Sequence, residues 1–362
     1  MSLNLELLSQ SGVSIWLDDL SRDRLENGSL ADLIAESNVV GVTTNPSIFS
    51  SSIAGSVLYK DDILALKKAG MSVADIVTEL TTSDVKAACD LFVPTFSKTL
   101  QIDGRVSIEV DPFLAHKTIE TIAQGKLLWK IVDRANLLIK VPATVQGLPA
   151  ISELTAAGIS VNVTLIFSVE RYKKVMDAYM SGLEERLAAS QPIDEIHSVA
   201  SFFVSRIDTE IDKRLDAIGL GSPLRGQSAI ANAHLAYEAF LNVINSDRWK
   251  KLKEAGANLQ RPLWASTGVK DKAYDSTRYV IELVAAHCVN TMPEGTLNEV
   301  RSRGEVRGDT ITSKISAAHE HFASLPAAGI DFADVVRHLE EDGVKKFADA
   351  WQELLDNVRA VS

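Results

Sequence analysis

The sequence predicts the α/β fold class and, within it, a (β/α)8 TIM barrel with additional N-terminal and C-terminal helices. Two observations support this prediction: eight short runs rich in β-branched and aromatic residues, and longer stretches of helical spacing between many of them. Strands that alternate with helices are typical of parallel sheets, and eight strands close this barrel. A doubly wound open sheet is the main alternative, but no G-x-G-x-x-G motif follows the first run to favour it.

The predicted elements repeat a βα unit along the chain. Strands are predicted over residues 14–18, 39–43, 106–110, 137–141, 159–164, 196–201, 262–266 and 287–292. Helical spacing is found over residues 30–37, 71–92, 114–134, 169–189 and 229–255.

Helices at both ends exceed the eight βα units. One is predicted over residues 4–11, and residues 331–358 have the spacing of an amphipathic helix. We expect residues 1–362 to form a single (β/α)8 barrel domain. Residues from about 302 to 362 are expected to be a C-terminal helical extension packed on that barrel rather than a second domain.

Composition and charge exclude several classes of protein. Hydrophobic residues make up 46% and charged residues 23% of the 362 residues, which is the balance of a globular protein. No apolar run approaches the ~20 residues of a membrane-spanning helix, and the first residues do not have the pattern of a secretory signal. A net charge of −11 disfavours a nucleic-acid partner, and two cysteines cannot build a disulfide framework. We therefore expect a cytoplasmic protein without membrane or nucleic-acid partners.

Polar side chains interrupt the predicted strands near their carboxyl ends. Residues two apart share a face of a strand, so Glu109 lies with Ser107 and Asn162 with Thr164. In a barrel these ends converge on one mouth, where active sites are found. We therefore expect one cavity to receive six side chains: Asp18, Glu109, Lys140, Asn162, Thr164 and Ser201.

Each of these residues also has an ordinary structural interpretation. A lysine at a strand end often reaches the surface, and an aspartate or asparagine there often caps the next helix. Asp19 could serve as a cap as well as Asp18. The structural interpretation must, however, be invoked separately for all six, including a lysine and a glutamate on neighbouring strands.

A buried lysine beside two carboxylates favours Schiff-base chemistry on a carbonyl compound. Burial favours the neutral, nucleophilic form of an amine, and an iminium then allows a C–C bond beside a hydroxyl to break or form. That step needs a base for the hydroxyl proton and an acid for dehydration. A metal site is not indicated, because the seven histidines are scattered, and no glycine-rich phosphate loop or G-x-S-x-G motif is present.

The chain resembles the transaldolases, of the longer bacterial kind, from about residue 13 to about residue 292. The motifs that carry the resemblance are IWLDD, GVTTNPSIF, VSIEVDP, LLIKVPAT, GISVNVTLIFS, SFFVSRID and LWASTGVK. Each alone is weak, but their order and spacing are specific as a set.

The resemblance implies a Schiff-base enzyme of the pentose phosphate pathway that needs no metal or other cofactor. It would transfer a dihydroxyacetone unit from sedoheptulose 7-phosphate to glyceraldehyde 3-phosphate, which gives erythrose 4-phosphate and fructose 6-phosphate. By resemblance Lys140 forms the Schiff base, Asp18 moves the hydroxyl proton, and Glu109 with Thr164 holds a proton-shuttling water. The implied substrate-binding residues are Thr44, Asn45, Asn162, Ser201, Arg206, Ser266 and Lys270.

The residues themselves support several of these roles. Asn45 precedes a proline, which favours extended backbone and a rigid turn, although a plain turn-forming asparagine is equally compatible. The guanidinium of Arg206 suits a phosphate, against the alternative of a surface ion pair. Phe202 or Phe203 could wall the dry side of the site.

Two departures from the family pattern are present. Many transaldolases place an arginine shortly after the position of Ser266, whereas this chain has Lys270. The stretch between Asp18 and Thr43 is also longer than in many members. Two alternative functions stay open: a lyase resembling fructose 6-phosphate aldolase, and a non-catalytic sugar-phosphate-binding barrel. The protein is expected to be a monomer or a homodimer with sugar phosphates as substrates.

Overall fold

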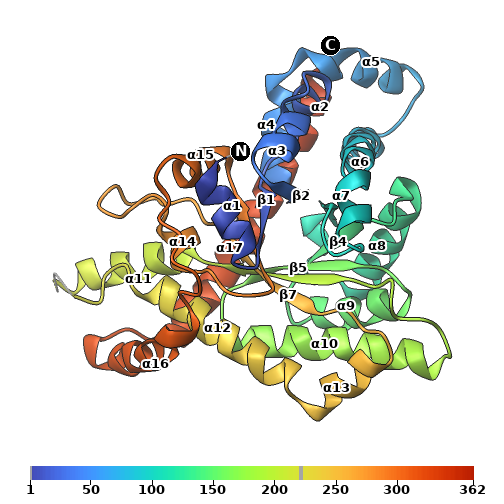
Figure 1. Ribbon diagram of the computed structural model, residues 1–362. Helices are drawn as coiled ribbons and strands as arrows, with labels where there is room; N and C mark the ends of the chain where they lie inside the picture. The colour runs from blue at the N-terminus through green and yellow to red at the C-terminus, as the bar shows by residue number, and fades with distance from the viewer. Residues whose placement is uncertain (1, 220–222) are drawn as a thin grey trace.

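A computed structural model of the chain describes residues 2–219 and 223–362. Eight parallel strands close into a barrel in sequence order, from β1 to β8, so the predicted TIM barrel is confirmed (Figure 1). The strands are β1 (Val13–Leu17), β2 (Val39–Val42), β3 (Arg105–Glu109), β4 (Leu137–Pro142), β5 (Val161–Ile166), β6 (Ser198–Phe203), β7 (Gln260–Ala265) and β8 (Cys288–Met292). Every predicted strand is present, with boundaries displaced by at most a few residues.

Helices alternate with the strands and extend the chain at both ends. Before β3 they are α1 (Leu3–Gln10), α2 (Arg22–Glu26), α3 (Ser29–Glu36), α4 (Pro46–Gly55), α5 (Lys60–Lys68), α6 (Val73–Leu91) and α7 (Val93–Lys98). Between β3 and β8 they are α8 (Thr118–Val132), α9 (Gly147–Ala156), α10 (Val169–Ala188), α11 (Ser205–Ala217), α12 (Ser228–Ile244), α13 (Asp247–Glu254) and α14 (Arg278–Ile281). After β8 come α15 (Glu294–Arg303), α16 (Ile315–Ser324) and α17 (Phe332–Ala360). None of the helices in the described ranges is long and apolar enough to cross a membrane.

One predicted helix is divided in the structure. Residues 229–255 were expected to be continuous, but α12 ends and α13 begins around Ser246. The Ser246 backbone is extended, and its hydroxyl accepts a hydrogen bond from the Trp249 amide at 3.2 Å. Serine side chains compete for backbone groups in this way, so they favour helix starts over helix interiors.

The strand register brings the polar residues of three strands into one layer. Glu109 of β3 lies opposite Lys140 of β4, and Lys140 lies opposite Asn162 of β5. All residues of these three strands are buried, because the barrel interior covers one face and the outer helices cover the other. The register therefore sets the distances between the backbone positions of these polar residues, whatever rotamers their side chains adopt.

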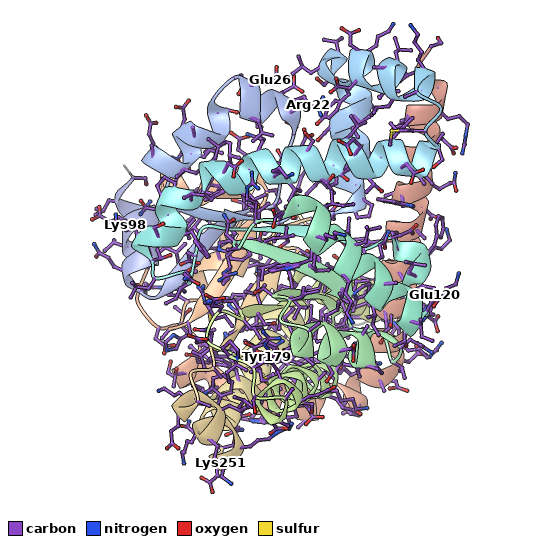
Figure 2. The ribbon with its side chains drawn as sticks, turned by 90° about the vertical axis from the view of Figure 1, so that its right-hand side faces the viewer. Arg22, Glu26, Lys98, Glu120, Tyr179 and Lys251 are labelled. Atoms are coloured by element: carbon purple, nitrogen blue, oxygen red, sulfur yellow. The ribbon has the colours of Figure 1, made fainter. Side chains whose placement is uncertain are left out.

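The hydrophobic core continues from the barrel into the outer helices. One large cluster contains strand residues such as Val141 together with Leu354 of α17, and a smaller cluster packs Tyr179 of α10 against Trp249 of α13. Burial of each large apolar side chain contributes about 1.5–3 kcal/mol to stability. Figure 2 shows the difference in placement: Tyr179 lies within the molecule, whereas the exposed Glu26 and Lys251 point into solvent.

The longest helix, α17, crosses the carboxyl end of the barrel. It contacts α11, β5, α6 and α4 in turn and is the red helix behind the strands in Figure 1. Gly343 permits the close approach, because a Cβ there would lie 3.1 Å from Leu165 and 3.5 Å from Phe167. The C-terminal helix therefore covers the mouth of the barrel.

Candidate active site

Lys140 is buried in the barrel wall at the carboxyl end of β4. Its side chain is only 5% exposed, and Nζ donates a hydrogen bond to the Thr44 carbonyl oxygen at 2.9 Å. The same nitrogen lies 3.2 Å from Oε2 of Glu109. A buried amine is expected to be paired or used, and here its partner is a carboxylate on the neighbouring strand.

The Glu109 carboxyl group is suited to moving protons near neutral pH. Burial raises its pKa to about 7, although Lys140 acts in the opposite direction. Despite the close ion pair, neither carboxyl oxygen has a partner in hydrogen-bond geometry among the described residues. A neighbouring cavity of about 20 Å³, lined by Glu109, Asn45 and Trp351 among others, is large enough for one water.

Asp18 follows β1 and is held by two strands. Its amide donates to the Met292 carbonyl at 2.8 Å, and its carboxylate accepts from the Thr43 hydroxyl at 2.8 Å. Thr43 lies in turn 2.6 Å from the Thr291 hydroxyl. Burial raises the pKa of Asp18, whereas Lys140 and the Thr43 hydrogen bond lower it. The aspartate is thus fixed in orientation and able to bind a proton more readily than an exposed one.

These groups surround a cavity of about 90 Å³ at the barrel mouth. Six residues expected from the sequence line it: Asp18, Asn45, Lys140, Ser201, Arg206 and Ser266. Of the two phenylalanines expected to wall the site, Phe203 lines this cavity and Phe202 does not. The other lining residues are Thr43, Ala265, Thr291 and Phe347.

Five expected residues lie outside the lining of this cavity: the exposed Lys270 and four buried residues. Glu109, Asn162, Thr164 and Thr44 are buried in the barrel around Lys140. Ser201 donates to Asn162 Oδ1 at 2.7 Å, and the Asn162 amide donates to Ser107 at 3.0 Å, so this asparagine links three strands. The Thr44 hydroxyl donates a hydrogen bond to the Ser107 carbonyl at 2.7 Å. The Thr44 carbonyl accepts the hydrogen bond from Lys140.

The hydroxyl of Thr164 is buried and has no hydrogen-bond partner in the described part of the chain. A buried hydroxyl without a partner is costly, by about 1–3 kcal/mol. In a barrel lined by reactive groups, such an atom is a candidate for binding a water or a substrate.

Asn45 caps a helix and also lines the cavity. It is the N-cap of α4, where Oδ1 accepts from the Ile48 amide at 3.0 Å and Pro46 occupies the first helical position. It also lines the cavity. The cap fixes the side chain, so its amide group faces the site from a rigid support.

Arg206 places an unsatisfied cation at the cavity. One guanidinium nitrogen, Nη1, is buried without a hydrogen-bond partner among the described residues. Burial lowers the pKa of Arg206, opposed by the charges of Asp342 and Asp18. Ser266 lies beside it with a left-handed backbone (φ 55°) and its hydroxyl 3.0 Å from that of Ser205. Lys270, by contrast, is exposed and does not line the cavity.

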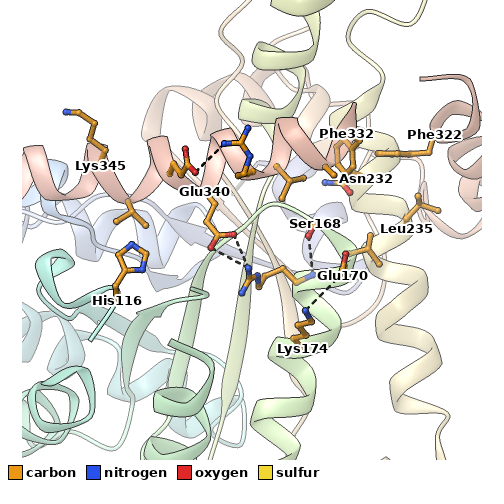
Figure 3. Close-up of a pocket in the computed structure, with 17 residues that line it drawn as sticks. His116, Ser168, Glu170, Lys174, Asn232, Leu235, Phe322, Phe332, Glu340 and Lys345 are labelled. Carbon is orange, nitrogen blue, oxygen red and sulfur yellow. Dashed lines mark hydrogen bonds and ion pairs between the residues drawn. The ribbon is translucent and has the colours of Figure 1, made fainter. Parts of the chain in front are cut away.

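A larger cavity of about 900 Å³ lies between α10, α12, α16 and α17 (Figure 3). Its lining includes apolar residues such as Leu235 and Phe332, and an ion pair joins Arg171 to Glu340 at 3.2 Å. None of the polar strand-end residues lines it, so we place the candidate active site at the smaller cavity around Lys140.

Sequence reasoning assigned no role to four lining residues: Thr43, Ala265, Thr291 and Phe347. Thr43 is part of the TTNPS motif and Thr291 lies in β8, so their strand-end positions were signals that could have been used. Phe347 comes from α17, and its amphipathic spacing gave no indication that it faces the barrel mouth.

The chain is similar to known proteins over nearly its whole length. A family profile described as Transaldolase/Fructose-6-phosphate aldolase matches residues 15–358. The chain is 56% identical over 360 residues to a transaldolase of Mycobacterium tuberculosis, which covers 99% of this chain and 96% of that relative. It is 55% identical over 356 residues to a transaldolase of Saccharopolyspora erythraea, which covers 98% of this chain and 97% of the relative.

Proposed function

We propose that this chain, which belongs to the transaldolase/fructose-6-phosphate aldolase family, transfers a dihydroxyacetone unit through a Schiff base on Lys140. The observation that carries the proposal is the buried amine, 3.2 Å from a carboxylate at the barrel mouth. The reaction would convert sedoheptulose 7-phosphate and glyceraldehyde 3-phosphate into erythrose 4-phosphate and fructose 6-phosphate. Sugar phosphates are the substrates that a transaldolase requires.

Imine formation is the first chemical step. The neutral Lys140 amine attacks the ketose carbonyl, and the resulting carbinolamine loses its hydroxyl as water. Glu109 would donate the proton that this hydroxyl needs, directly or through a water held with Thr164. A pKa of about 7 supports this role, because the carboxyl group is then available in both forms at neutral pH.

Cleavage of the carbon–carbon bond follows. Asp18 would remove the proton from the hydroxyl beside the scissile bond, and the bond electrons move into the iminium to give an enamine. The aldose phosphate leaves, and a second aldose phosphate accepts the enamine carbon while Asp18 returns the proton. Lys140 and Asp18 line the same cavity, which supports this division of roles.

The remaining residues would hold the substrate. Asn45, Asn162 and Ser201 offer amide and hydroxyl groups to the three-carbon unit, and the Thr44 carbonyl positions Lys140. Arg206 and Ser266 would bind the phosphate, which is supported by the unpartnered nitrogen of Arg206 at the cavity. Lys270 would be a second phosphate-binding cation only if its exposed side chain turned toward the mouth.

Borohydride reduction in the presence of fructose 6-phosphate tests the proposal. We expect a three-carbon adduct on the peptide that contains Lys140, detected by mass mapping. An adduct on another lysine would overturn the assignment of the nucleophile. Fructose 6-phosphate consumption should depend on erythrose 4-phosphate, whereas cleavage at the same rate without this acceptor would favour the aldolase activity named in the family description.

We also propose that residues 302–362 belong to the same domain as the barrel, supported by the shared hydrophobic core. We also propose that the protein is located in the cytoplasm and that it is a monomer or a homodimer. Sedimentation velocity would measure the oligomeric state.

A further inference from the structure

The ring of Phe347 closes the candidate active site from outside the barrel. The residue is 5% exposed, and its ring centroid lies 5.5 Å from Nζ of Lys140. It lines the cavity together with Asp18 and Lys140, yet it comes from α17 rather than from a strand end. An aromatic ring within ~6 Å of a cation attracts it, so the ring would favour an iminium at this nitrogen.

Contacts along α17 hold this ring in place. On the N-terminal side of Phe347, Asp334 pairs with Arg214 at 2.8 Å, and Glu340 pairs with Arg171 at 3.2 Å. On the other side, the Asn357 amide donates to the Ser50 hydroxyl at 3.2 Å. The helix is therefore attached on both sides of Phe347, and the ring forms part of the cavity wall over Lys140.

The size of the cavity indicates what it can hold with the ring in place. Its volume of about 90 Å³ is well below the ~300–1,000 Å³ of pockets that enclose a whole small-molecule ligand. A three-carbon fragment on Lys140 suits this space better than a complete sugar phosphate. The three-carbon enamine is therefore the bound species that this cavity fits best with the ring in place.

We propose that Phe347 is a specificity-determining residue that keeps water from the enamine on Lys140, so that the unit is transferred rather than released. The proposal rests on the Schiff-base function above. An enamine has two fates. Its carbon can form a bond to an acceptor aldehyde, whose oxygen then takes a proton. Alternatively the carbon takes a proton from water, and hydrolysis of the iminium releases dihydroxyacetone and restores the amine.

The ratio of these two fates tests the proposal. Release is measured as dihydroxyacetone formed from fructose 6-phosphate alone, and transfer as sedoheptulose 7-phosphate formed when erythrose 4-phosphate is added. We expect Phe347→Ala to raise the ratio of release to transfer at least tenfold. Phe347→Leu should give an intermediate increase, and it replaces the alanine variant if that protein does not fold. The ratio is independent of the folded fraction, because both reactions need folded enzyme.

Leu339→Ala is the matched control. Leu339 lies on the same helix and is equally buried at 5% exposed, but it does not line the cavity. Its truncation should lower stability and leave the ratio unchanged. An unchanged ratio in both Phe347 variants, or an equal rise in Leu339→Ala, would overturn the proposal. Failure of borohydride to label Lys140 in the unsubstituted protein would instead overturn the Schiff-base function on which it rests.

Discussion

The two ends of the barrel both bury charged side chains, but these side chains differ in how fully they are hydrogen-bonded. At the amino ends of the strands, Arg261 donates to Asp103 at 3.0 Å, to the Ser14 hydroxyl and to the His287 carbonyl. Asp103 also accepts from Ser14 at 2.7 Å. At the carboxyl ends, both oxygens of Glu109 and one nitrogen of Arg206 have no hydrogen-bond partner among the described residues.

The difference separates a structural cluster from a reactive one. A buried polar atom without a partner costs about 1–3 kcal/mol, so it persists only where something else compensates or uses it. A buried atom without a hydrogen-bond partner does not by itself identify a reactive site, because Nη1 of Arg105 at the amino end also has no partner among the described residues. At the carboxyl end, Arg206 lines the same cavity as Lys140, and Glu109, 3.2 Å from the Lys140 amine, lines a second, water-sized cavity.

Lys140→Ala tests the reactive end most severely. Turnover should be abolished, because the substitution removes the nucleophile while leaving the fold. Transfer from fructose 6-phosphate to erythrose 4-phosphate measures the effect, with circular dichroism as the check on folding. Lys126→Ala is the control, since Lys126 forms an exposed ion pair with Glu153. Substantial activity in Lys140→Ala would mean that the buried ion pair is structural after all.

Asp18→Asn should reduce the transfer rate by roughly 10²–10⁴, the usual contribution of a positioned acid or base. Borohydride trapping of the three-carbon unit from dihydroxyacetone should be retained, because imine formation does not need this carboxylate. Asp19→Asn, at the partly exposed neighbour that pairs with Arg24, should change the rate little. Loss of trapping in Asp18→Asn would move the aspartate to an earlier step.

Paired arginine substitutions compare the two ends directly. Arg206→Ala should raise the KM for fructose 6-phosphate roughly 10–100-fold, which corresponds to the ~1.5–3 kcal/mol of a hydrogen bond to a charged group. Transfer from unphosphorylated dihydroxyacetone should be less affected. Arg261→Ala should instead lower the free energy of unfolding by ~3–5 kcal/mol, because it leaves the Asp103 carboxylate buried without its charged partner. Reversed outcomes in the two variants would refute the comparison.

The pH dependence of stability gives the smallest expected effect. Burial raises the pKa of Glu109 from its ordinary value of 4.5 to about 7. The folded protein therefore binds the proton more tightly than the unfolded chain does. Protonated Glu109 therefore contributes its full stabilisation of the folded state below about pH 4.5. This contribution is lost as the pH rises through about 7.

Glu109→Gln removes this ionisation. Relative to the unsubstituted protein, the variant should gain up to about 3 kcal/mol in unfolding free energy between pH 4 and pH 8. Urea unfolding at the two pH values measures the difference. A constant difference between the proteins would show that Glu109 has an ordinary pKa.

The strands and the residues at their ends could be predicted because both depend on local pattern and topology. Once the barrel closes, the period of two and the parallel register bring Glu109 and Lys140 side by side. Asn45 shows the limit of such reasoning, since a turn-forming asparagine and one that faces the site were treated as alternatives, whereas Asn45 caps α4 and lines the cavity.

The contribution of α17 could not be predicted from the sequence. An amphipathic pattern shows which face of a helix is buried but not what it is buried against. The path across the mouth depends on long-range contacts, such as the close approach of Gly343 to Leu165. The same applies to Lys270, whose charge fits a phosphate but whose exposed side chain lies outside the cavity lining.

The crossing of α17 has a consequence for the order in which the protein is assembled. All eight strands precede this helix in the chain and are synthesised before it. The aromatic cover of the lysine is therefore carried by the last helix of the chain to be made. The amine and its dry surroundings thus come from two parts of the chain that are made at different times.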